Sequence, residues 1–284
     1  MKHSFKPEVL DLLRCPTCGV GNRLSSNGNG HMVCSGCNVE YPIGKGYLNL
    51  YPDYQESVTP IQHLCQSAPM IAIYDKIWRP FGYFFTSSRS FPEDLDRITE
   101  LMDPEQCQTV LDLACGPGNF TRNIARYGKE TKVVGFDLAD RMLERAAELS
   151  TAPEYSNVCF MRGNALEMPF ESESFDAVIC CAALQLFTNY DRALSEIARV
   201  LKPGGAFVCQ TIATEDTPPL WLRMADQIMK FGYFKMRDLK AQLDRLELDI
   251  TVEESSKVSY IFRAVKRESA RILDAELETA SSQR

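Results

Sequence analysis

Two CxxC pairs near the N-terminus carry the clearest chemical signal in this sequence. Cys15 and Cys18 form the first pair, Cys34 and Cys37 form the second, and 15 residues separate them. This spacing is typical of structural zinc sites, because each pair makes a tight turn and two facing turns complete a tetrahedron of sulfur ligands. With all four ligands supplied by cysteine, we predict a closed structural Zn²⁺ site; a redox CxxC pair is the alternative.

A second candidate site begins at a glycine-containing turn. Residues 110–120 (VLDLACGPGNF) predict a buried strand, a turn with Gly116 and Gly118, and a helix that starts near Asn119. Such glycines let the backbone approach a ligand closely, and the free N–H groups of a helix start favour an anionic group. A dinucleotide-binding fingerprint would place a third glycine at position 121, which is Thr121. Alone, the turn is a weak signal.

Polar residues after the next two strands strengthen this signal. Asp137 closes the apolar segment 133–136, at the distance expected of a carboxylate that accepts both hydroxyls of a ribose. Gly163 and Asn164 follow the third apolar segment, where a polar side chain could contact the edge of an adenine. The ordered set predicts a site for an adenosine-containing ligand.

These residues must be positioned by an α/β fold. Short apolar runs alternate with segments of helical spacing, which predicts a parallel sheet with helices on both faces; the runs are 109–114, 132–136, 158–161, 177–181 and 206–211. After an irregular stretch with Pro218 and Pro219 come a helix at 236–246 and two consecutive strands at 248–253 and 258–265. We therefore expect a Rossmann-like, seven-stranded, mostly parallel sheet with a C-terminal antiparallel hairpin, preceded by a small zinc ribbon.

The composition narrows the partners. The chain has 284 residues and a formal net charge of -7, which supplies no field for a phosphate backbone and makes RNA a less favoured partner. No signal peptide or membrane-spanning apolar run is evident, and eleven cysteines without a secretion signal indicate a reducing compartment. We expect a cytoplasmic protein without a membrane span; the sequence does not indicate its oligomeric state.

The ordered motifs from Asp112 to Gly205 resemble those of class I S-adenosylmethionine-dependent methyltransferases, in particular the branch with ubiquinone and menaquinone biosynthesis enzymes. The resemblance covers residues 70–266 and implies S-adenosylmethionine as the methyl donor. It places the methionine end of the donor at Asp112, Ala114, Gly116 and Gly118, the ribose at Asp137, the adenine at Leu138, Met142, Asn164 and Ala165, and the sulfonium beside Cys181. In related enzymes a Tyr-Asp pair closes over the donor, which makes Tyr74 a lid residue.

Two positions depart from that family pattern. Many relatives have Asp where Asn164 stands, and Asn keeps an acceptor oxygen. Many also have His where this chain has Gln185, so no general base and no catalytic residue can be assigned from the sequence.

The N-terminal segment resembles a zinc-ribbon domain that occurs free, as an activator of RNA and protein methyltransferases, and fused to several bacterial methyltransferases. The resemblance depends on residues 12–18, 34–37 and 41–48. We accordingly divide the chain into a zinc ribbon (1–52), an aromatic linker or lid (53–95), a methyltransferase domain (96–266) and a polar C-terminal tail (267–284).

Three functions follow as hypotheses. The favoured one is methyl transfer to a small, apolar or aromatic metabolite, because aromatic segments flank the catalytic core and the chain is acidic. The alternative is methylation of a ribosomal or transfer RNA base, with the zinc ribbon recognising RNA or a partner. The third is a donor-binding regulatory module without turnover.

Overall fold

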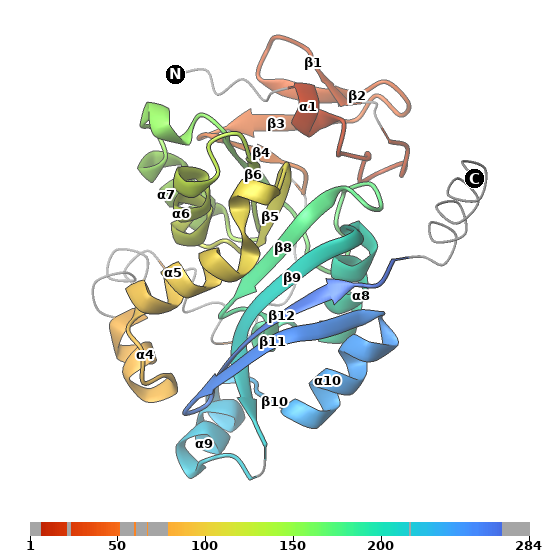
Figure 1. Cartoon of the computed structure of the whole chain (residues 1–284). Coiled ribbons are helices and arrows are strands. Elements are labelled where there is room, and N and C mark those ends of the chain that lie inside the picture. The colour runs from red at the N-terminus through yellow and green to blue at the C-terminus, as the bar shows by residue number, and fades with distance from the viewer. Residues whose placement is uncertain are drawn as a thin grey trace, which may run out of the picture.

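The computed structural model describes residues 7–21, 24–51, 79–215 and 217–268, together with Pro60 and Ser67. A twisted sheet runs through these residues (Figure 1). Its catalytic-domain part has the order β7-β6-β5-β8-β9-β12-β11. The strands are β5 (Thr109–Leu113), β6 (Lys132–Asp137), β7 (Val158–Arg162), β8 (Phe175–Cys181), β9 (Leu201–Thr214), β11 (Leu248–Ser256) and β12 (Ser259–Lys266).

Strand directions match the sequence prediction. Strands β5 to β9 are parallel to their neighbours, whereas β12 is antiparallel to β9 and to β11. The predicted seven-stranded sheet with a C-terminal antiparallel hairpin is therefore confirmed. A short strand, β10 (Phe234–Lys235), also pairs with the end of β9.

Helices cover both faces of this sheet, because side chains alternate between the faces along each strand. On β5, Val110 packs with helix residues such as Ile98 and Ile124, whereas Leu111 belongs to the cluster that contains Leu194 and Leu239. The first face is covered by α5 (Phe91–Met102) and α6 (Asn119–Tyr127), and the second by α8 (Tyr190–Val200) and α10 (Met236–Arg245).

The remaining helical elements pack elsewhere around the sheet, and the helix of residues 140–149 packs on β6 and β7. They are α1 (Pro7–Leu10), α4 (Arg79–Thr86), α7 (Asp140–Leu149), α9 (Leu220–Met229), η2 (Pro104–Gln106), η3 (Pro153–Tyr155) and η4 (Leu184–Leu186). Helix α9 lies in the stretch that the sequence analysis treated as irregular, and that expectation is wrong. Within the described residues, no helix is long and apolar enough to span a bilayer.

The zinc ribbon continues the same sheet. Its strands are β1 (Leu24–Ser26), β2 (His31–Cys34), β3 (Glu40–Gly44) and β4 (Tyr47–Asn49), each antiparallel to the next. Strand β4 then pairs in parallel with β7, with Leu48 opposite Met161. The edge of the catalytic sheet is therefore completed by the ribbon rather than left open.

Ribbon and catalytic domain also share one hydrophobic core. Leu13 and Leu48 are fully buried and Leu50 is 1% exposed, in the cluster that contains Phe136 and Phe170. Backbone hydrogen bonds also join the parts outside the β4–β7 pairing, among them Glu171 N to Leu12 O (2.8 Å), Arg14 N to Pro169 O (3.1 Å) and Leu50 N to Arg162 O (3.1 Å). The ribbon is therefore packed into the catalytic domain and is not a detached appendage.

The proposed boundary between the linker and the methyltransferase domain, at residues 95 and 96, falls inside a helix. Helix α5 begins at Phe91 and packs on α6 and β9, so it runs across the position between residues 95 and 96. Most of the proposed linker, including Tyr74, and most of the proposed tail lie outside the described residues.

Candidate functional site

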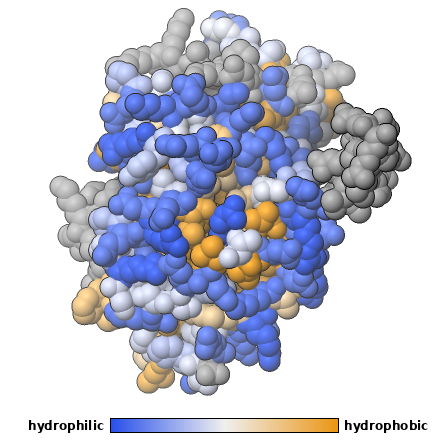
Figure 2. Space-filling view, in the orientation of Figure 1, coloured by the Kyte–Doolittle hydropathy of each residue, from blue (hydrophilic) through white to orange (hydrophobic). Residues whose placement is uncertain are grey.

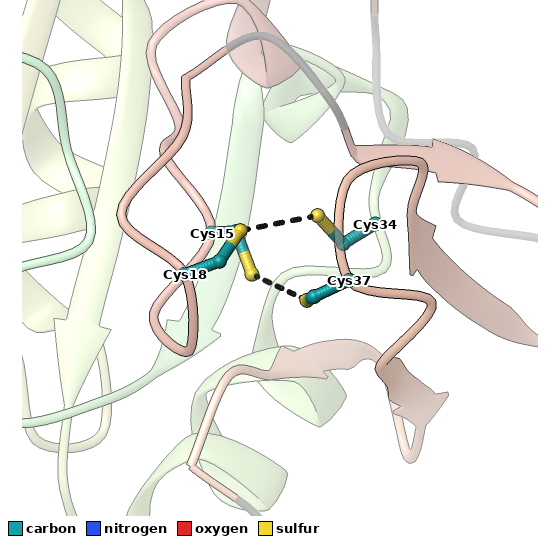
Figure 3. Close-up of side chains that lie close together, drawn as sticks. All are labelled: Cys15, Cys18, Cys34 and Cys37. Carbon is teal, nitrogen blue, oxygen red and sulfur yellow. Dashed lines mark hydrogen bonds between the residues drawn. The ribbon is translucent and has the colours of Figure 1, made fainter.

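The four predicted zinc ligands converge at one end of the ribbon (Figure 3). Their Sγ atoms all lie within 4.8 Å of one another, with Cys15 and Cys37 3.6 Å apart and Cys18 and Cys34 3.7 Å apart. Sulfur atoms about 2.3 Å from a tetrahedral zinc lie about 3.8 Å from each other. The cluster therefore has the dimensions of a zinc site with four cysteine ligands, in which every coordination position is taken by protein.

A tyrosine supports this cluster. The Tyr41 hydroxyl lies 3.2 Å from Cys15 Sγ and 2.8 Å from Thr17 Oγ1. Burial on its own would raise the pKa of Cys15, but hydrogen bonds from Tyr41 and from the backbone lower it to about 6. The pKa values of Cys18 and Cys37 are raised instead, because one backbone hydrogen bond to each is outweighed by burial and the contacts with the other thiols. Since zinc binds thiolates, its binding should release protons from this cluster.

The glycine turn lies between β5 and α6. Ala114, Gly116 and Gly118 all have positive φ angles, of 57°, 54° and 73°. A Cβ on Gly118 would lie 3.1 Å from the Ala146 Cβ and 3.2 Å from a ring carbon of Phe160, whereas a Cβ on Gly116 would meet no atom within 4 Å. Gly118 is thus required for packing, and the backbone at Gly116 is open to a ligand.

Asp137 lies at the carboxyl end of β6, beside this turn. Its Oδ2 accepts a hydrogen bond from Gly116 N and its Oδ1 accepts one from Ala139 N, both at 2.8 Å. Burial raises the pKa of Asp137, and the two backbone donors oppose that rise. A carboxylate has about four lone-pair positions, so two remain for further donors such as ribose hydroxyls.

Asp112 lies deeper. It is 2% exposed, and its carboxylate accepts a hydrogen bond from the Thr121 hydroxyl in the first turns of α6. Burial raises its pKa to about 7, although the bonds from Thr121 lower it. The Asp112 side chain therefore holds the start of α6 against the end of β5. Its contact with the methyl donor stays a prediction.

The other predicted donor residues gather at the same edge, because the carboxyl ends of parallel strands meet there. Ala114, Leu138, Asn164, Ala165 and Cys181 are all half-buried, and Met142 is buried beside them. Asn164 Oδ1 accepts a hydrogen bond from Leu166 N (2.9 Å), which orders the turn after β7. Burial raises the pKa of Cys181 well above its ordinary value, so its thiol stays neutral.

Sequence reasoning missed a buried polar chain next to Cys181. The Tyr83 hydroxyl on α4 donates to Gln210 Oε1 (2.8 Å), and Gln210 Nε2 donates to Asp94 Oδ2 (2.7 Å). Gln210 lies directly opposite Cys181 in the β8–β9 register. Its presence inside the apolar run 206–211 was the signal that could have drawn attention to it.

Gln185 is held next to this group by hydrogen bonds, one of them to Thr211, the residue after Gln210. Its Oε1 accepts a hydrogen bond from the Thr211 hydroxyl (2.9 Å), and its Nε2 donates to Ala182 O (3.2 Å). These bonds fix the amide where many relatives have an imidazole. An amide does not act as a general base, so the catalytic residue stays unassigned.

A second set of contacts links the ribbon to the residues that follow Asp137. The Tyr47 hydroxyl donates to Asp140 Oδ1 (2.6 Å), while Arg162 donates to the carbonyl oxygens of Leu138 (3.0 Å) and Tyr51 (3.1 Å). Leu138 and Asp140 immediately follow Asp137. The ribbon thus supports the backbone that presents the ribose candidate, a relation that depends on the β4–β7 pairing and is invisible in local sequence patterns.

Comparisons with known proteins agree with both parts of this arrangement. Residues 110–205 match the methyltransferase domain family, and residues 6–46 match the Trm112p-like protein family. An uncharacterised chloroplastic methyltransferase of Arabidopsis thaliana is 28% identical over 255 residues, which cover 82% of this chain and 72% of the relative. The demethylmenaquinone methyltransferase of Lactococcus lactis is 41% identical over 102 residues, or 36% of this chain and 40% of that protein.

Solved structures share the fold. A phosphoethanolamine N-methyltransferase of Haemonchus contortus aligns with a TM-score of 0.62 at 18% identity, covering 76% of this chain and 62% of that one. A complex of the Haloferax volcanii Trm112 methyltransferase activator with a methyltransferase aligns with a TM-score of 0.59 at 16% identity, covering 75% of this chain and 100% of that one.

The sheet order, the glycine turn with its acidic neighbour and the family matches together define a class I S-adenosylmethionine-dependent methyltransferase. The chain also carries an N-terminal segment that matches the Trm112p-like protein family and holds a four-cysteine cluster with the dimensions of a zinc site.

Proposed function

We propose that this enzyme methylates a small, apolar or aromatic acceptor. The observation that favours the proposal is a series of aromatic rings that packs α4, α5 and α6 together beside the glycine turn. Phe120 of α6 contacts Phe91 (ring centroids 5.8 Å apart), and Phe91 contacts Tyr83 of α4 (5.6 Å). We expect the acceptor to bind next to these rings, because aromatic surroundings suit a flat or hydrophobic ligand.

The proposed donor site uses the residues of the strand edge. Asp137 accepts the ribose hydroxyls, the backbone at Gly116 approaches the methionine end, and Cys181 provides a neutral wall near the sulfonium. Bound S-adenosylmethionine supplies an already activated methyl group, so the protein mainly aligns the acceptor and excludes water. The proposal therefore assigns binding and positioning to these residues and no proton transfer.

The hydrogen bonds that join Tyr83, Gln210 and Asp94 extend this proposal to the acceptor side. The Tyr83 hydroxyl donates to Gln210 Oε1, and Gln210 Nε2 donates to Asp94 Oδ2. We expect these groups to add a polar part to the otherwise aromatic surroundings of the acceptor.

The curated relatives support the same acceptor class without fixing the substrate. Several bacterial relatives that match between 36% and 48% of this chain are named demethylmenaquinone methyltransferases. The chain spans between 40% and 60% of the length of these three proteins. Their names therefore support only the chemical class of acceptor proposed for this chain.

RNA methylation is the second candidate, and the Trm112-like ribbon is the observation that favours it. Its strand β4 is already paired with β7, and Lys45 of the ribbon is paired with Glu144. RNA affinity usually depends on several phosphate contacts by Lys and Arg. These features support the small-molecule acceptor over the RNA acceptor.

The test is methyl transfer from labelled donor into a cell extract that is then separated into RNA, protein and lipid or metabolite pools. The wild-type chain should label the lipid or metabolite pool, Asp137→Asn should lose most of that transfer, and the exposed-site control Asp238→Asn should retain it. Label in RNA would refute the proposal in favour of the second candidate. Donor binding without any labelled product would instead indicate a regulatory module.

A further inference from the structure

Helix α9 presents its apolar side to solvent. Leu220, Met224 and Ile228 are spaced four residues apart on one helical face, and they are 69%, 51% and 67% exposed. Leu222 is the buried residue of this helix, and it packs with Ile212 on β9. The helix is therefore anchored by one side chain while its apolar stripe points outward, the reverse of a core-facing amphipathic helix.

Helix α4 extends this apolar surface. The Phe85 and Trp221 rings lie 6.3 Å apart and join the two helices, and Phe84 is 71% exposed. Figure 2 shows apolar side chains at the lower end of the molecule, over α4 and α9, and Figure 1 places this end opposite the ribbon. We call this surface, formed by Phe84, Phe85, Leu220, Trp221, Met224 and Ile228, the α4–α9 patch.

Cations border the patch. Lys257 Nζ lies 5.3 Å from the centroid of the Phe84 ring, and Arg223 and Lys230 are exposed on α9 and at its C-cap. The acid within α9, Asp226, accepts a hydrogen bond from Gly232 N (3.1 Å) and so faces the following loop. This local positive charge stands out in a chain whose net charge is -7.

We propose that the α4–α9 patch docks on a lipid bilayer that contains anionic headgroups. Helices that lie in the bilayer interface carry Trp, Phe and Leu on one face and Lys or Arg beside them, and insert the apolar face below the headgroups. Each Lys or Arg near an anionic surface adds to the attraction. The exposed patch with three bordering cations has this composition, which fits a bilayer better than a neutral protein surface.

The patch is also attached to the acceptor side of the site. Tyr83 of α4 binds Gln210, opposite Cys181. The loop after α9 packs on Gln185 so closely that a Cβ on Gly232 would lie 2.1 Å from the Gln185 carbonyl oxygen. Docking through the patch would therefore bring the proposed acceptor side against the membrane surface. That consequence rests on the proposed function, whereas the docking itself does not.

The test is co-sedimentation of the full-length protein with vesicles of phosphatidylcholine containing phosphatidylglycerol. The triple variant L220Q/M224Q/I228Q should bind at least tenfold more weakly than the wild type. Tyr127→Gln removes an apolar side chain that is 55% exposed at the end of α6, and this control should bind like the wild type. Wild-type binding should also fall in high salt and with vesicles of phosphatidylcholine alone.

Three results would overturn the proposal. In the first, the wild type stays in the supernatant; in the second, the triple variant and the wild type sediment equally with the vesicles. The third is a concentration-dependent dimer, measured by analytical ultracentrifugation, that the triple variant abolishes while vesicle binding is absent, since the patch would then bind a second copy. Equal melting temperatures and equal donor affinities of all variants, measured without vesicles, show that the substitutions leave the fold and the donor site unchanged.

Discussion

Removal of zinc should destabilise the whole enzyme and not the ribbon alone. The metal holds the fold of the ribbon, whose Leu13, Leu48 and Leu50 are almost completely buried in the shared core. Full burial of a leucine contributes about 1.5–3 kcal/mol, so loss of the three contacts costs roughly 5–9 kcal/mol. Since a typical domain is stable by only about 5–15 kcal/mol, the catalytic domain should not survive unchanged.

The assay is calorimetric melting of the zinc-loaded protein, the chelated protein and Cys34→Ser. We expect one transition in each, lowered by about 10 °C or more without zinc, because each kcal/mol shifts the melting temperature of a large domain by about 2–4 °C. Cys107→Ser makes the same chemical change at a half-buried cysteine outside the zinc cluster and should leave the chelator effect intact. A zinc-free protein that melts in two steps, with the main transition unmoved, would refute the reasoning.

Two further outcomes follow from the donor side. The pKa of Asp112 rises to about 7 on folding, so the folded chain binds this proton more tightly than the unfolded chain between about pH 4 and 7. The free energy of unfolding should therefore fall as pH rises through this range, by at most about 1.4 kcal/mol per pH unit. Urea unfolding at several pH values should show this slope in the wild type relative to Asp112→Asn, and parallel curves would contradict it. Gly118→Ala should cost at least about 1 kcal/mol, because φ is positive and the new Cβ would crowd Ala146, which thermal unfolding would reveal; an unchanged melting temperature would contradict that packing.

The sequence was sufficient where local patterns determine the structure. The two CxxC pairs predicted the sulfur cluster, since ligand spacing alone decides whether two turns can face each other. The apolar runs predicted β5 to β9, because buried parallel strands form continuous apolar segments. Two further strand segments predicted the final antiparallel hairpin, whereas the two-residue strand β10 was not predicted. Asp137 and the glycine turn followed from their positions at strand ends.

Features that depend on distant parts of the chain were not predictable in this way. The pairing of β4 with β7 joins Leu48 to Met161, and no local pattern indicates which edge of a sheet receives a strand. Helix α9 was missed because it follows two prolines and because its apolar residues face solvent, so it lacks a core-facing pattern. The link from Tyr83 through Gln210 to Asp94 likewise exists only once α4 packs on β9.

The most direct test of the donor site is calorimetric titration of S-adenosylhomocysteine into the wild type, Asp137→Asn and Asp238→Asn. Asn keeps one acceptor oxygen but places an NH2 group against the N–H of Gly116 or Ala139. Loss of one charged hydrogen bond, about 1.5–3 kcal/mol, should weaken binding roughly 10- to 150-fold. Asp238→Asn, which alters an exposed carboxylate on α10, should bind like the wild type, at one site per chain. Equal affinities of Asp137→Asn and the wild type would contradict the placement of the methyl donor at this strand edge.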